Sequence, residues 1–134
     1  MRKVITSVML TFLASVAFSV SVLAQSQDPK QPSMEELATQ EADRLGAILK
    51  LEDWQIFYVD SILTHDYKAM QRDIEAMSAA KYANSDLFYG VQDKWMEQMY
   101  QALHKVFDDK QWTKYLKSGA ARDKKMRDKR MKKK

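Results

Sequence analysis

The feature that most constrains the fold is one continuous apolar stripe of helical spacing in the middle of the chain. Its seven members recur every three or four residues: Ile56, Val59, Leu63, Tyr67, Met70, Ile74 and Met77. This spacing predicts a single amphipathic helix from about residue 52 to about residue 80. Such a helix is ~42 Å long, whereas a compact chain of this size has a radius of gyration of only ~13 Å. The stripe therefore predicts an elongated fold.

Three further helices are predicted around this long one. A capping box at Ser33–Glu36 predicts the start of the first helix, and Asn84, Ser85 and Asp86 predict a turn before a third helix that ends near Val106. A fourth helix begins near Asp108, with Gly119 as its expected stop. The chain shows neither the alternation of a strand nor a Gly-rich loop. The predicted class is all-α, an elongated four-helix arrangement built on an antiparallel hairpin.

The first half of the long helix is apolar on two sides. Leu51, Trp54, Tyr58 and Ile62 lie almost opposite the main stripe. A hairpin of two helices cannot cover both faces by itself, and a second copy of the chain is the simplest partner. The sequence therefore predicts a homodimer.

Residues 1–24 have the pattern of a secretory signal peptide. Arg2 and Lys3 precede an apolar run, and Ala24 followed by polar residues resembles a cleavage site. The alternative is an uncleaved membrane anchor, because the run is nearly long enough to span a bilayer. We expect a cleaved signal, a linker over 25–32, a helical domain over 33–118 and a basic tail over 119–134. Cysteine is absent, which excludes disulfides, thiol catalysis and thiolate metal sites.

Charge is distributed unevenly along the exported part of the chain. Residues 25–121 hold 11 Lys and Arg against 16 Asp and Glu, whereas residues 122–134 hold 9 against 2. The basic tail suits an anionic membrane surface or acidic client segments, and export argues against nucleic acid. Two alternatives for the tail stay open, a disordered solubilising segment and a frayed basic helix.

Catalytic and metal chemistry find little support in the sequence. Histidine occurs only at His65 and His104, and no nucleophile–base arrangement accompanies them. We therefore expect no enzyme activity and no cofactor. The two imidazoles are weak metal candidates, because helical angle points both away from the apolar seam and towards solvent.

A short pattern occurs twice, each time at a predicted helix start. The first copy comprises Leu51, Glu52 and Gln55, and the second comprises Phe107, Asp108 and Gln111. An acidic N-cap with Gln three residues later forms a capping box, in which two orphan N–H groups are satisfied reciprocally. Asp108 suits this role better than Glu52, because Glu is a weaker N-cap. The simplest interpretation of the repeat is two helix starts.

With the export signal and the long central helices, this repeat resembles the periplasmic Spy/CpxP-like family, whose mark is a repeated Leu-Thr-x-x-Gln. The resemblance covers roughly residues 45–116. Glu52 and Asp108 replace the threonine, and Phe107 replaces the second leucine. The resemblance implies a homodimeric, cradle-shaped, ATP-independent periplasmic chaperone or envelope-stress accessory protein. Close relatives of the same shape imply an alternative, a periplasmic protein that binds or senses heavy metals.

Candidate client-binding residues follow from side-chain type. Methionine and aromatic side chains adapt to varied partners, so they suit promiscuous recognition of unfolded envelope proteins. The residues expected to stay partly open near the hairpin are Met77, Tyr82, Met96 and Tyr100. The alternative is that they fill the core or the dimer seam.

Overall fold

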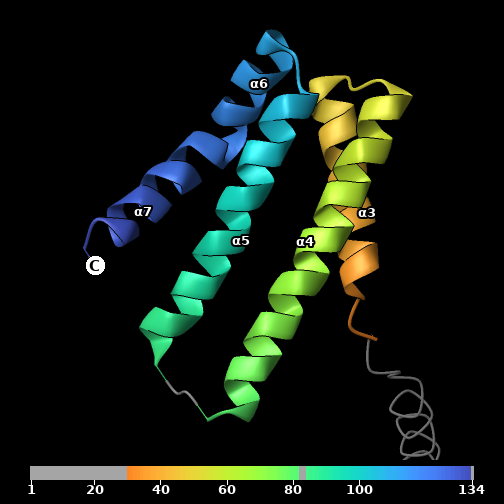
Figure 1. Cartoon of the computed structure of the whole chain (residues 1–134). Helices are drawn as coiled ribbons and strands as arrows, with labels where there is room; N and C mark the ends of the chain where they lie inside the picture. Colours follow the sequence, from red (N-terminus) through yellow and green to blue (C-terminus); the bar gives the residue numbers. More distant parts are fainter. Residues whose placement is uncertain (1–29, 82–83, 134) are drawn as a thin grey trace, which may run out of the picture. The chain divides into compact units, whose positions relative to one another are not determined.

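A computed structural model describes residues 30–81 and 84–133 of the chain. The elements are α3 (Met34–Leu49), α4 (Asp53–Ala79), α5 (Ser85–Val106), α6 (Asp109–Tyr115), a π-helical turn η1 (Leu116–Ala120) and α7 (Ala121–Met131) (Figure 1). The described residues contain no strand, so the all-α class is confirmed. Among them, no helix combines the length and apolarity that crossing a membrane requires. The predicted signal, 1–24, and linker residues 25–29 lie outside the described ranges.

Helix α3 begins at the predicted capping box. The backbone N–H of Ser33 donates to Glu36 Oε2 at 2.8 Å, and the backbone N–H of Glu36 donates back to Ser33 Oγ at 3.1 Å. The helix ends at Lys50, which adopts the left-handed conformation. Gly46 lies buried against α4, where an added Cβ would stand 2.9 Å from Ile56 Cδ1. This glycine therefore permits the close approach of α3 and α4.

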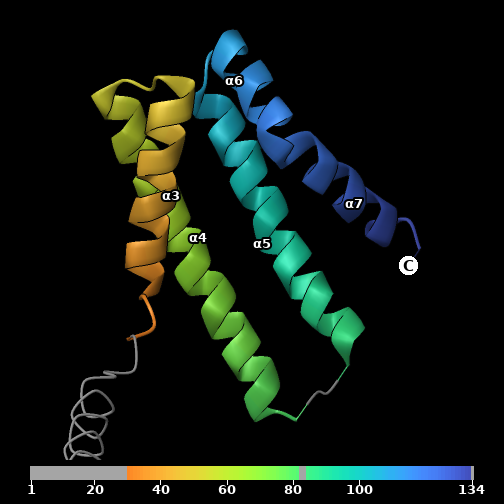
Figure 2. The same ribbon diagram turned by 180° about the vertical axis from the view of Figure 1, so that it is seen from behind.

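Helices α4 and α5 form the predicted hairpin. Both views show them side by side, with α3 lying against the first half of α4 (Figures 1 and 2). The 27 residues of α4 agree with the length expected from the apolar stripe. Near the hairpin end, Trp95 Nε1 donates to Asp73 Oδ2 at 2.7 Å and connects the two helices.

The apolar core gathers where α3 covers the hairpin. Its buried members are Ala38, Ala42, Leu45, Leu49, Leu51, Val59, Leu63, Met99, Leu103 and Phe107. Beyond the end of α3, the stripe residues Ile74 and Met77 are only half-buried. The helical spacing of Phe88, Val91, Trp95 and Met99 predicts an inner apolar stripe on α5, but Phe88 is 41% exposed, so the prediction is wrong for this residue. Its position on the first turn of α5 leaves it outside the part of the hairpin that α3 covers.

The basic C-terminal segment is helical. Gly119, expected as a stop, instead adopts φ 121° between η1 and α7 and kinks the chain without ending it. Of the two alternatives left open for this segment, the helix is found over Ala121–Met131. The compact unit accordingly extends from Pro32 to Lys134. Figure 2 shows α7 following α6 along the side of α5.

Candidate functional site

The two copies of the repeated pattern meet in space through their glutamines. Gln55 Nε2 donates to Gln111 Oε1 at 2.7 Å, and Gln111 Nε2 donates to Gln55 Oε1 at 3.1 Å. Gln55 Nε2 also donates to the backbone carbonyl of Val106 at 3.0 Å. Gln55 is only 4% exposed. The pair therefore joins the start of α4 to the start of α6 through a buried, reciprocal amide contact.

Each glutamine also caps its own helix. Gln55 Oε1 accepts the backbone N–H of Glu52 at 2.9 Å, and Gln111 Oε1 accepts that of Asp108 at 3.0 Å. Asp108 Oδ1 completes the second box by accepting the backbone N–H of Gln111 at 2.8 Å. The carboxylate of Glu52 instead accepts the indole N–H of Trp54 at 2.5 Å. The sequence predicted two helix starts, but it did not predict that they bond to each other.

An aromatic cluster surrounds the second copy. The ring of Phe107 meets Tyr115 edge-on at a centroid distance of 5.5 Å, and Trp112 lies 5.4 Å from Tyr115. Burial raises the pKa of the Tyr115 phenol to about 12. The apolar residues that precede the two caps, Leu51 and Phe107, are both buried in the core. The repeat therefore serves as a structural junction, in which the acidic caps Glu52 and Asp108 are exposed and the apolar residues and Gln55 are buried.

Of the four candidate client-binding residues, the three that the structure describes lie on two different helices. Met77 is half-buried near the end of α4, and Tyr82 lies outside the described residues. Met96 and Tyr100 are half-buried on α5, on the side that faces α7. The ring of Tyr100 meets Trp112 edge-on at 4.9 Å. Helix α7 therefore partly covers the two α5 residues that we expected to be open.

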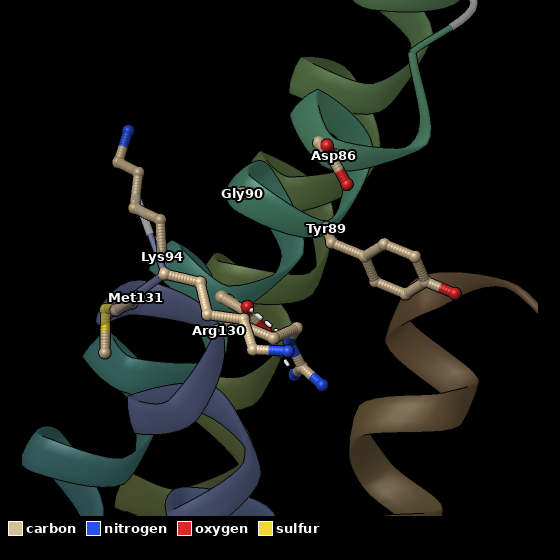
Figure 3. A pocket seen from close by; sticks show the side chains of 8 residues that line it. Asp86, Tyr89, Gly90, Lys94, Arg130 and Met131 are labelled. Carbon is tan, nitrogen blue, oxygen red and sulfur yellow. Dashed lines mark hydrogen bonds and ion pairs between the residues drawn. The ribbon is translucent and has the colours of Figure 1, made fainter.

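A ladder of ion pairs holds α7 on α5. Arg130 Nε and Nη2 donate to the two carboxylate oxygens of Asp93 at 2.8 and 2.6 Å. One turn further along, Arg127 Nη2 donates to Glu97 Oε2 at 3.3 Å, and Lys124 Nζ lies 3.1 Å from Glu97 Oε1. Figure 3 shows Arg130 reaching from α7 to α5, where dashed lines mark its hydrogen bonds to the Asp93 carboxylate. These contacts were missed by sequence reasoning.

Tyrosine rings and electrostatics support the ladder. The guanidinium of Arg127 lies 5.4 Å from the ring centre of Tyr100, and that of Arg130 lies 5.7 Å from that of Tyr89. Two opposing effects act on the pKa of Glu97: partial burial acts to raise it, and hydrogen bonds from Gln101, Lys124 and Arg127 act to lower it. The hydrogen bonds outweigh the burial, so the pKa lies below the usual value of 4.5. The Glu97 carboxylate is therefore stabilised in its charged form by the cations of α7.

Two hollows lie between α5 and α7. A cavity of about 390 Å³ has Tyr89, Gly90 and Lys94 on its α5 side and Arg130 and Met131 on its α7 side (Figure 3). A second cavity, of about 230 Å³, is lined by Met96 of α5 and by residues of α7 that include Met126. Helix α7 therefore packs on α5 through charged contacts with open space beside them.

Two exposed apolar patches, each containing aromatic residues, were only partly predicted from the sequence. At the start of α4, Trp54, Phe57 and Tyr58 are 52%, 68% and 53% exposed, and their rings meet edge-on. Trp54 and Tyr58 belong to the predicted second apolar face, but Phe57 was not singled out. At the start of α5, Leu87, Phe88 and Tyr89 form the second patch, between 41% and 48% exposed. Contiguous apolar surface of this kind marks interaction sites.

The two histidines are not assembled into a metal site. His65 is exposed, and its Nδ1 lies 2.8 Å from Asp66 Oδ1. His104 is also exposed and stacks on Trp112 with ring centres 4.0 Å apart. Across residues 30–81 and 84–133, no three or more His, Asp or Glu side chains are grouped as ligands for a metal ion.

Comparison with known protein families, with curated proteins and with solved structures finds no match for this chain.

Proposed function

We propose that this protein is an ATP-independent, chaperone-like or envelope-stress accessory protein that binds unfolded envelope proteins in the periplasm. The observation that carries the proposal is the exposed patch of Leu87, Phe88 and Tyr89 at the start of α5, which is between 41% and 48% exposed and lies outside the proposed dimer contact. Exposed aromatic groups on a rigid helix suit weak binding of varied apolar segments. The resemblance to the Spy/CpxP-like family and the signal-like residues 1–24 support the same proposal.

The second apolar face of α4 supports a homodimer within this proposal. Leu51 is buried in the chain's own core, but Trp54 and Tyr58 are exposed and Ile62 is half-buried. A second copy that covers the exposed members would remove costly apolar surface from water. Sedimentation of the protein at micromolar concentration tests this, because a monomer that binds no hydrophobic dye contradicts the dimer.

The outer face of α7 supports the proposed contact with an anionic membrane surface. Lys125, Lys129 and Lys132 are exposed at helical spacing on the side away from the buried Arg127. Such a stripe attracts anionic headgroups, and the attraction falls as ionic strength rises. Co-sedimentation with vesicles that contain or lack anionic phospholipid, at low and high salt, tests this contact.

The central experiment follows the light scattering of an unfolded client protein that aggregates on dilution. We expect the purified protein to suppress aggregation without ATP, both with and without a metal chelator. Suppression that disappears with chelator would instead favour the alternative, a heavy-metal-binding or heavy-metal-sensing protein of the same helical family. A protein that gives no suppression in either condition contradicts the chaperone proposal.

A further inference from the structure

The α5 face that α7 covers carries carboxylates and tyrosine rings, which are groups that bind cations. We define the α5 groove by five residues on consecutive turns: Tyr89, Asp93, Met96, Glu97 and Tyr100. Asp93 and Glu97 stand four residues apart on one helix face, and each faces a cation of α7. The two tyrosine rings lie beside these carboxylates and face the same guanidinium groups. Carboxylates flanked by aromatic rings bind arginine by charge, hydrogen bonds and cation–π contact together.

Helix α7 occupies this groove with almost no apolar packing. Of its 11 residues only Ala121, Met126 and Met131 are uncharged, and Arg127 is the only one that is buried. None of the 11 belongs to the buried apolar core of the described residues. Cavities of about 390 and 230 Å³ lie along the contact. The contact therefore depends mainly on charge, which salt and competing cations weaken.

The connection to α7 contains a point of backbone freedom. Gly119 has φ 121°, a conformation that other residues rarely adopt, and an added Cβ at this position would meet nothing within 4 Å. It lies in the π-helical turn η1 (Leu116–Ala120) between α6 and α7. A glycine at this point allows the backbone to turn between α6 and α7, so the direction of α7 can change at this position.

We propose that the α5 groove is an interaction surface for cationic helical segments of other proteins, and that α7 occupies it as a displaceable internal ligand. This inference rests on the proposed client binding and names one client class, helices with arginines three or four residues apart. In the closed state an incoming segment competes with α7, whose effective concentration is of millimolar order because it is tethered. The apparent affinity of the groove for an incoming segment is therefore its intrinsic affinity multiplied by the fraction of molecules in which α7 has left the groove.

The test uses the full protein and a fluorescent peptide with the sequence of residues 121–133. Variant R127E/R130E reverses the inner face of α7 and should release it. The matched control, K125E/K129E, makes the same change in charge on the exposed outer face and leaves the ion pairs intact. We expect the peptide to bind R127E/R130E at least about tenfold more tightly than it binds K125E/K129E. Circular dichroism checks that both variants fold, and the milder variant R130S should shift affinity in the same direction.

Specificity is tested by removing the groove's charge. Adding D93N and E97Q to R127E/R130E should abolish the gain in peptide affinity. Equal affinity for the inner-face and outer-face variants, or binding that survives D93N/E97Q, overturns the inference.

A parallel aggregation assay with the parent protein separates this inference from the proposed function. If the parent protein protects a client but release of α7 gives no gain in peptide binding, only the inference about the α5 groove is refuted. Groove-dependent peptide binding without protection refutes only the chaperone proposal.

Discussion

The glutamine pair that joins the two repeats should be among the most sensitive polar contacts in the chain. Replacement of Gln55 by Ala removes the side-chain acceptor for the backbone N–H of Glu52, which costs about 1 kcal/mol as a lost cap. It also leaves the Val106 carbonyl and the Gln111 amide without their partner, at about 1 kcal/mol each. Because Gln55 is 4% exposed, solvent does not readily replace these bonds. We expect a total loss of about 3 kcal/mol.

The reciprocity of the pair gives a sharper test than either single change. Gln111→Ala removes the acceptor for the Asp108 N–H, at about 1 kcal/mol, and the reciprocal bonds with Gln55, at about 1 kcal/mol. The single change should therefore cost about 2 kcal/mol. The double variant loses the shared bonds only once. Its cost should therefore be about 1 to 2 kcal/mol smaller than the sum of the single costs.

Urea unfolding followed by far-ultraviolet circular dichroism measures all three free energies. Gln71→Ala is a suitable control, because Gln71 is an exposed glutamine on the same helix and should change stability by less than about 0.5 kcal/mol. Strictly additive costs for Gln55 and Gln111, or a Gln55 variant as stable as the control, would refute the account of the repeats as a bonded junction.

Four further expectations concern single features of the fold. Asp108→Ala should lower the free energy of unfolding by about 1 kcal/mol in urea titrations, through loss of its cap to the Gln111 N–H. The folded-state pKa of Glu97 is lowered, so its stabilisation is present above pH 4.5 and is lost as pH falls below that value. Proteolysis at the basic helix should then accelerate. The Tyr115 pKa is raised to about 12, so its contribution is present below pH 10 and is lost between pH 10 and about 12, which thermal melts should detect. Replacement of Trp54 and Phe57 by Ser should weaken dimerisation in sedimentation and leave the melting temperature of the monomer nearly unchanged, because both side chains are exposed.

Sequence patterns determined those parts of the fold that depend on neighbours along the chain. The stripe from Ile56 to Met77 predicted the length of α4, because helical periodicity is a local property of the sequence. The capping boxes at Ser33 and Asp108 predicted where helices begin, because a cap satisfies N–H groups only two or three residues away. The all-α class followed from the same local signals.

Only the tertiary structure decided which side chains meet across helices. The pairing of Gln55 with Gln111 joins residues 56 apart in sequence, and nothing in either copy of the repeat identifies the other as its partner. Exposure was likewise decided by coverage. Phe88 has the correct periodicity for burial, but it lies beyond the region that α3 covers.

The basic segment shows the same division most clearly. Its charge was evident from the sequence. Its ion pairs with Asp93 and Glu97 depend on the direction that the chain takes through η1 after α6. Composition alone is compatible with both a disordered tail and a helix, because a segment without an apolar face derives little stability from itself. In the structure the segment is a helix whose arginines pair with carboxylates on α5. The spacing of Arg127 and Arg130 matches those carboxylates only after α5 and α7 lie side by side, and that placement is a property of the assembled unit.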